Sequence, residues 1–311
     1  MVESTKKACI ATVIDNDAIK RRFGRLTIQL EGEAARCFEQ VKPGQFAQIR
    51  LSEAALPHPD HITNDLADIA CRQIILRRPF SFCNVTVDSP TRARVEILYC
   101  VLGPGTLRMT TLSKGDKISI IGPLGNGFSV PAGKKLALLV AGGMGAPPLQ
   151  HMAAYLKADF PKVRTFAFVG AKTLGDLPFT VEGLESGKPV ITEFAKAGAE
   201  SHIATDDGSA GFRGFVTECL TDWLKANKPA PDETIIYSCG PEPMLAEVAR
   251  LAAQYEIDCQ VSMERMMACG IGLCQSCAVE CKVGGKDKTV YKLCCKDGPV
   301  FDAREVVFER R

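Results

Sequence analysis

The chain has 311 residues, with 38 lysines and arginines against 36 aspartates and glutamates, so its formal net charge is only +2. This length allows two or three domains with cores of their own. A near-neutral chain gives no electrostatic reason to expect a nucleic-acid or anionic-membrane partner. The longest apolar stretch, residues 136–141, is far too short to span a bilayer.

Before residue 131, short segments rich in β-branched and apolar residues alternate with turn residues. They cover residues 8–17, 24–32, 44–52, 92–101 and 116–125. Regularly spaced short strands predict a small antiparallel β-barrel, which we assign to residues 1–131. The polar, proline-containing segment 53–71 interrupts this pattern. We expect it to be a surface insertion with a helical turn, and its role stays open.

From Lys134 onward, apolar strands alternate with segments of helical periodicity. This alternation predicts a doubly wound parallel sheet, an α/β domain, at residues 132–258. The expected elements are a strand, turn and helix at 134–158, strands at 165–173 and 188–194, a helix at 215–226, and a strand, turn and helix at 233–255. A compact cysteine-rich module follows at residues 259–311.

Two turns of the predicted α/β domain connect a strand to a helix. In the turn AGGMGAPP, glycine allows the chain to turn tightly and lets the backbone approach a pyrophosphate at the helix N-terminus. The pattern is not the full dinucleotide-binding fingerprint, and such a turn can also be purely structural. Two turns in one sheet predict a ligand crevice at the carboxyl ends of its strands. The candidate nucleotide-binding residues are Gly142, Gly143, Gly145, Cys239, Gly240 and Pro241.

Two motifs of the predicted barrel, RRPFSF and LYCVLGPGT, have residue types that suit a diphosphate. Arg78 offers a planar, permanently charged group, and Ser81 offers a hydroxyl. The Gly105–Thr106 pair allows close backbone approach. The alternative is a purely structural role, in which Arg78 is an exposed charge at a strand end and Gly103 and Gly105 form a turn.

The C-terminal module contains Cys269, Cys274 and Cys277 in the spacing C-x4-C-x2-C, with further cysteines downstream. This is the plant-type pattern for a [2Fe–2S] cluster, whose two irons need four thiolates. A structural zinc site usually has two short cysteine pairs or a cysteine–histidine mixture, and no histidine follows His202. Zinc and ordinary reduced cysteines remain the alternatives. From spacing alone, the fourth ligand is open among Cys281, Cys294 and Cys295.

These motifs, in this order, resemble the ferredoxin–NADP reductase superfamily, and the ending ACGIG-x-C-x-x-C … C-KDGPVF resembles the electron-transfer subunits of dihydroorotate dehydrogenase B. The resemblance covers nearly the whole chain. It implies FAD on the barrel, NAD(H) in the crevice and a [2Fe–2S] cluster in the C-terminal module. The implied metal ligands are Cys269, Cys274, Cys277 and Cys295. The implied FAD contacts are Arg78, Pro79, Phe80, Ser81, Leu98, Tyr99, Cys100, Gly105 and Thr106, with Cys100 at a position where relatives commonly have arginine.

The resemblance further implies an NAD-linked oxidoreductase subunit without a catalytic acid or base of its own. Electrons would pass from the FMN of a dihydroorotate dehydrogenase catalytic subunit through [2Fe–2S] and FAD to NAD+, in pyrimidine (UMP) biosynthesis. A two-plus-two heterotetramer is implied. Similar subunits serve sulfide dehydrogenases, NAD(P)–ferredoxin oxidoreductases and hydrogenases, and a non-enzymatic cysteine sensor is a further alternative. The choice between NAD and NADP stays open.

The N-terminal residues lack the apolar run of a signal peptide. Most of the 14 cysteines are scattered singly rather than spaced as a disulfide framework. We therefore expect a cytoplasmic protein with buried, reduced thiols at Cys9, Cys37, Cys71, Cys83, Cys219 and Cys259.

Overall fold

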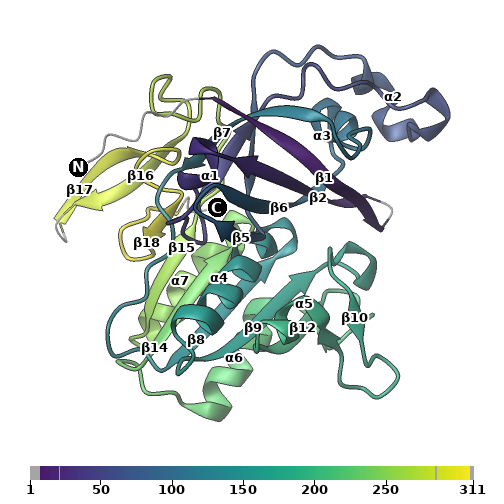
Figure 1. The fold of residues 1–311 in the computed structure, drawn as a ribbon. Coiled ribbons are helices and arrows are strands. Elements are labelled where there is room, and N and C mark those ends of the chain that lie inside the picture. Colours follow the sequence, from purple (N-terminus) through teal and green to yellow (C-terminus); the bar gives the residue numbers. More distant parts are fainter. Residues whose placement is uncertain (1–7, 21, 284–285, 309–311) are drawn as a thin grey trace. The chain divides into compact units, whose positions relative to one another are not determined.

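The computed structural model describes residues 8–20, 22–283 and 286–308, whose fold is drawn in Figure 1. These residues form two compact units. The first unit contains the described residues up to Val41 together with 45–124 and 266–276. The second contains 42–44, 125–265 and the described residues from Cys277 onward. The predicted boundary between residues 258 and 259 lies inside a strand, β15 (Asp258–Ser262), and the three-domain division remains a prediction. Residues 1–7 of the predicted barrel and residues 309–311 of the predicted C-terminal module lie outside the described residues.

The first unit is built on a seven-stranded antiparallel sheet, as predicted for the barrel. In order of pairing, its strands are β4 (Arg78–Ser81), β3 (Phe46–Ile49), β7 (Lys117–Leu124), β1 (Cys9–Lys20), β2 (Phe23–Glu31), β6 (Arg92–Cys100) and β5 (Asn84–Ser89). All five predicted strand segments form strands. The prediction missed β4 and β5. An arginine and a proline at the start of β4 hide its alternation, and β5 is mostly polar.

Alternating residues of these strands form the core of the first unit. Leu26, Ile28 and Leu30 of β2 are fully buried, while the residues between them are partly exposed. This period of two places one face of each strand in the core. The helices of this unit are α1 (Glu33–Arg36), α2 (Asn64–Ala70) and α3 (Pro104–Met109). Helix α2 lies in the predicted insertion, and its Leu66 packs with Leu107 of α3.

The second unit contains the predicted parallel sheet. Its strands are, in order, β13 (Phe212–Arg213), β12 (Glu200–Thr205), β9 (Arg164–Ala171), β8 (Leu136–Gly142), β14 (Thr234–Cys239), β15 and β18 (Val300–Asp302), and only β18 runs antiparallel to its neighbour. The helices are α4 (Ala146–Asp159), α5 (Thr192–Lys196), α6 (Val216–Asn227) and α7 (Glu242–Gln254). None of the helices formed by the described residues is long and apolar enough to cross a membrane.

One predicted element of the sheet is wrong. The segment 188–194 forms only the two-residue strand β11 (Val190–Ile191), paired with β10 (Val181–Glu182), before α5 begins. The strand that follows β9 in the sheet is β12. Its first half reads Glu-Ser-His, which hides the apolar run expected of a parallel strand. In the structure the His202 ring stacks on Phe168 at a centroid distance of 4.7 Å, which explains how this strand packs despite its polar residues.

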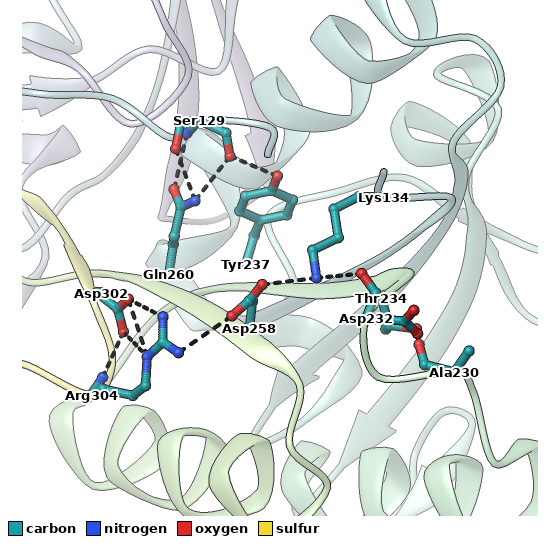
Figure 2. Close-up of polar contacts among 10 residues, drawn as sticks. All are labelled: Ser129, Lys134, Ala230, Asp232, Thr234, Tyr237, Asp258, Gln260, Asp302 and Arg304. Carbon is teal, nitrogen blue, oxygen red and sulfur yellow. Dashed lines mark hydrogen bonds and ion pairs between the residues drawn. The ribbon is translucent and has the colours of Figure 1, made fainter. Parts of the chain in front are cut away.

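The C-terminal part of the second unit adds a hairpin, β16 (Ala278–Val283) and β17 (Lys286–Leu293), and then β18 at the sheet edge. Figure 2 shows polar contacts that fix the segments flanking the sheet. The Asp258 carboxylate lies 2.8 Å from Lys134 Nζ and 3.5 Å from the Arg304 guanidinium. Ser129 exchanges hydrogen bonds with Gln260 and accepts one from the Tyr237 hydroxyl. The C-terminal segment is thus attached to the same sheet as the predicted nucleotide turns.

The burial expected for the scattered cysteines is mostly wrong. Cys83 and Cys259 are buried, but Cys9 and Cys219 are only half-buried, and Cys37 and Cys71 are exposed. Cys37 and Cys71 each follow the last residue of a short helix, α1 and α2, where the chain is open to solvent.

Candidate functional site

The structure brings two of the candidate flavin motifs together. The residues of β4, Arg78 to Ser81, are all half-buried. A Cβ atom added to Gly105 would lie 3.3 Å from Cγ of Arg78, so the arginine packs against the start of α3. Arg78 Nη1 donates to the Leu76 carbonyl at 2.9 Å, and a guanidinium has five N–H donors in total. The remaining donors, next to a glycine backbone, suit a diphosphate.

Two other candidate residues have side chains engaged inside the protein. Thr106 Oγ1 accepts from the backbone N–H of Leu102 and Gly103 at 3.0 and 3.2 Å, so its hydroxyl caps its own helix. The Tyr99 hydroxyl donates to Asn16 Oδ1 at 3.1 Å, and burial raises the pKa of Tyr99 to about 12. Contacts of Thr106 and Tyr99 with a ligand would therefore come from their backbone. Leu98, which is buried, and Cys100, which is half-buried, lie beside Tyr99 at the end of β6.

The two glycine turns of the second unit pack directly on each other. A Cβ atom at Gly145 would overlap the carbonyl oxygen of Cys239, and one at Gly142 would lie 2.6 Å from Met244 Sδ. Gly240 has φ of 159°, and a Cβ there would lie 3.0 Å from the Gly142 nitrogen. Gly143, in contrast, has φ of 52° and open space where its Cβ would be. Gly142, Gly145 and Gly240 therefore allow close packing, and Gly143 exposes its backbone.

The packed turns border a crevice of about 700 Å³ at the carboxyl ends of the parallel strands, the position where such sheets bind ligands. Gly142, Gly143 and Pro241 line it, as the sequence predicts. Several other lining residues were not predicted from the sequence, namely Asp176, Asp206, Phe215, Val216, Thr217, Met244 and Glu247. The signal that would have found Asp206 is its position directly after β12, but that strand was itself missed.

In the first unit, Cys269 and Cys274 lie in a loop whose N–H groups point at sulfur. Cys269 Sγ accepts from the backbone N–H of Ile271 and Cys274 at 3.5 and 3.4 Å. Cys274 Sγ lies 3.2 Å from Ser276 Oγ, and hydrogen bonds from Ser276 and from the backbone lower the pKa of the Cys274 thiol to about 6. Gly270 and Gly272 have φ of 71° and 89°, which allows this wrapping. Such surroundings stabilise thiolates, the form that binds iron.

In the second unit, neighbouring cysteines have different surroundings. The backbone N–H of Cys295 donates to Cys277 Sγ at 3.4 Å. The thiol of Cys294 instead donates to the Met263 carbonyl at 3.2 Å, and burial raises its pKa to about 12. Burial also raises the pKa of Cys281, which lies in β16. These contacts favour Cys295 over Cys294 and Cys281 as a ligand.

In the part of the chain that the structure describes, no three histidine, cysteine or carboxylate side chains form a preformed metal site. The ligand assignment therefore rests on the cysteine spacing and on the surroundings of each thiol. N–H groups directed at sulfur and a depressed thiol pKa fit an iron–sulfur cluster. The residues present thus suit the expected cofactor.

The fold has close counterparts among solved structures. An NADH-dependent reduced ferredoxin–NADP oxidoreductase, studied for flavin-based electron bifurcation, has a TM-score of 0.71 at 23% identity, covering 96% of this chain and 90% of that chain. A ferredoxin–NADP+ reductase from Neisseria gonorrhoeae, solved with FAD and NADP, has a TM-score of 0.54 at 13% identity, covering 80% of this chain and 92% of that chain. At such identities the likeness concerns the fold. The chain thus has a ferredoxin-reductase-like fold and a cysteine-rich C-terminal segment.

The sequence comparisons narrow this class to one family. Residues 264–307 match the model of the iron–sulfur cluster binding domain of dihydroorotate dehydrogenase B. The electron transfer subunit of dihydroorotate dehydrogenase B (NAD(+)) from Bacillus caldolyticus is 35% identical over 93% of this chain and 96% of its own length. The subunit from Listeria innocua is 37% identical over 89% and 91%. The chain belongs to this family of electron transfer subunits.

Proposed function

We propose that this chain is the electron-transfer subunit of a dihydroorotate dehydrogenase B. It connects the oxidation of dihydroorotate by a catalytic partner subunit with the reduction of NAD+, in pyrimidine (UMP) biosynthesis. The observation that carries the proposal is the match to such subunits over most of the chain, which includes the iron–sulfur segment at residues 264–307. The partner is proposed to carry FMN and to form a two-plus-two heterotetramer with this chain.

The cofactors proposed for the chain are FAD, a [2Fe–2S] cluster and NAD(H) as co-substrate. FAD would supply the conversion between single-electron transfer with an iron–sulfur cluster and hydride transfer with nicotinamide. The chain's own residues supply binding and position. Arg78 and the backbone at Gly105 hold the FAD diphosphate, and the two packed glycine turns shape the nicotinamide-nucleotide crevice. No side chain of this chain has to act as a general acid or base.

The proposed cluster ligands are Cys269, Cys274, Cys277 and Cys295. The N–H contacts to the sulfurs of Cys269 and Cys277 support the assignment. We also propose a cytoplasmic location, which is supported by the lack of disulfide bonds among the fourteen cysteines, all of which the structure describes.

The charges of the crevice support NAD(H) rather than NADP(H). Lys172 is accompanied by three carboxylates, Asp176, Asp206 and Glu247. A 2′-phosphate entering a crevice with more carboxylates than cations would meet net repulsion. A ribose 2′-hydroxyl can instead donate to a carboxylate.

The test is dihydroorotate-dependent NADH formation under anaerobic conditions, with this chain mixed with the FMN-containing catalytic subunit from the same organism. Iron, sulfide and FAD contents are measured first. Activity is expected only when both proteins are present. Absence of coupling, with intact cofactors and flavin that NADH still bleaches, would assign the chain to a different redox partner.

A further inference from the structure

One buried polar side chain of the first unit has no role in the fold that surrounds it. Gln48 lies in β3 and is fully buried. Neither Nε2 nor Oε1 has a hydrogen-bond partner among the described residues. Buried amides normally form hydrogen bonds, because leaving them unpaired costs their full desolvation. An unpaired amide at such a position indicates a partner other than the described residues of the chain.

The Gln48 side chain lies on the outer face of the sheet. Its neighbours in β3, Ala47 and Ile49, both belong to the hydrophobic core. Since successive strand residues point to opposite faces, the amide points away from that core. The Gln48 amide therefore makes no contribution to packing the hydrophobic core of the first unit.

The amide lies directly against the cysteine loop. A Cβ atom on Gly270 would overlap Gln48 Nε2 and would lie 2.7 Å from Gln48 Cδ. Gly270 follows Cys269, whose sulfur already accepts two backbone N–H groups. The loop therefore passes over Gln48 with only a glycine between them, and Nε2 is the amide atom closest to that glycine.

The same strand position also adjoins the candidate flavin motif. Gln48 pairs with Pro79 of β4, and Phe46 pairs with Ser81. Residues paired across an antiparallel ladder share a face, so Gln48 shares its face with Pro79 and Ser81. The neighbouring Arg77 is not a free donor on this face, because its guanidinium donates to Ser119 O and Oγ, both at 2.8 Å.

We propose that Gln48 is a positioning residue for the iron–sulfur cluster, with its Nε2 donating a hydrogen bond to the sulfur atoms held by the Cys269–Cys274 loop. The inference rests on the proposed function in so far as the cluster is bound there. Hydrogen bonds to cluster sulfurs stabilise the more negative, reduced cluster and raise its reduction potential. Gln48 thereby tunes electron exchange between the cluster and the flavin side of the sheet.

The experiment is a potentiometric titration of the purified FAD- and cluster-loaded chain, followed by EPR of the reduced cluster. Gln48→Met, which keeps the shape and removes the donor, is expected to lower the midpoint potential and change the g values. Gln48→Asn, which keeps an amide, is expected to stay closer to the wild type. Gln150→Met is the matched control, because Gln150 is another buried glutamine with an unpaired atom among the described residues but lies in α4.

These readouts separate the proposal from a structural role. The midpoint potential does not depend on how much protein retains its cluster, so partial loading of Gln48→Met does not obscure the result. An unchanged potential and unchanged g values in Gln48→Met would overturn the inference while leaving the proposed function intact. A wild-type chain without a [2Fe–2S] EPR signal after reduction would overturn both.

Discussion

The backbone N–H of Cys295 points at the sulfur of Cys277 at a distance of 3.4 Å. The neighbouring Cys294 turns its thiol the other way, to the carbonyl of Met263. Two adjacent cysteines that the spacing rules treat alike thus have different environments. Both residues are buried, but the backbone of Cys295 contacts a second candidate ligand, whereas the thiol of Cys294 is used in a hydrogen bond within the fold.

We therefore expect Cys295→Ser to abolish cluster incorporation and Cys294→Ser to retain it. Serine at position 294 keeps a donor for the Met263 carbonyl, so the fold should lose little stability. Iron and acid-labile sulfide per chain, together with visible absorbance, measure the outcome. Loss of the cluster in Cys294→Ser alone would reverse the assignment of the fourth ligand.

Arg78→Ala should weaken FAD binding by roughly 10- to 100-fold, which corresponds to the loss of a charge-assisted hydrogen bond. Flavin stoichiometry after gel filtration, and the Kd for FAD added back to the apoprotein, measure this effect. Arg92→Ala is the control, because Arg92 is an exposed arginine at the start of β6 in the same sheet. Equal flavin retention in both variants would remove Arg78 from the site.

Gly145→Ala should disturb the nucleotide crevice, because the added methyl group overlaps the backbone of Cys239. We expect a loss of about 1–3 kcal/mol in the free energy of unfolding, as for other overpacked sites, and weaker NADH binding. Gly133→Ala provides the comparison. Its φ of 84° strains an alanine, whereas Gly145 has an ordinary φ of −73°, but no described residue lies within 4 Å of the new methyl group at position 133. Both variants should therefore lose stability in urea unfolding, and only Gly145→Ala should weaken NADH binding in a titration.

Asp206→Asn should reduce the discrimination against NADPH. Removing one carboxylate from the crevice lowers the repulsion of a 2′-phosphate by about 1 kcal/mol, or roughly fivefold in relative affinity. The ratio of kcat/KM for NADH and NADPH, measured with an artificial electron acceptor, gives the answer. If the NADH-to-NADPH ratio of kcat/KM equals that of the wild type, the ribose 2′ position of the nucleotide does not lie near Asp206.

His151 should make the second unit acid-sensitive. It is buried in α4, and burial lowers its pKa from 6.5 to about 4. Between these two values the unfolded chain binds a proton that the folded chain does not. Stability is therefore complete above pH 6.5 and decreases as the pH falls toward 4, by roughly 2 kcal/mol at pH 5. Urea unfolding at pH 7.5 and pH 5 should show a smaller decrease for His151→Leu than for the wild type.

Much of the fold follows from local sequence patterns. The alternation in β2 and the apolar run in β8 each predict an element from neighbouring residues alone, and both elements form. The turns at Gly142–Gly145 and Cys239–Pro241 likewise lie at the expected strand ends. Strand β12 was missed because its polar first half is stabilised by stacking of His202 on Phe168, a contact between different strands.

The sequence by itself determined the expectation of an iron–sulfur cluster, because cysteine spacing is a short-range feature that a cluster requires directly. FAD and NAD(H) were expected from the resemblance that the ordered motifs have to a family. Only the tertiary structure decided how these motifs are supported. It packed Gly145 under Cys239, turned the Thr106 and Tyr99 side chains into the protein, and placed the unpaired amide of Gln48 beneath Gly270. Such contacts join residues far apart in the chain. Their partners depend on strand pairing and on which face of a sheet is covered, and no local pattern records either.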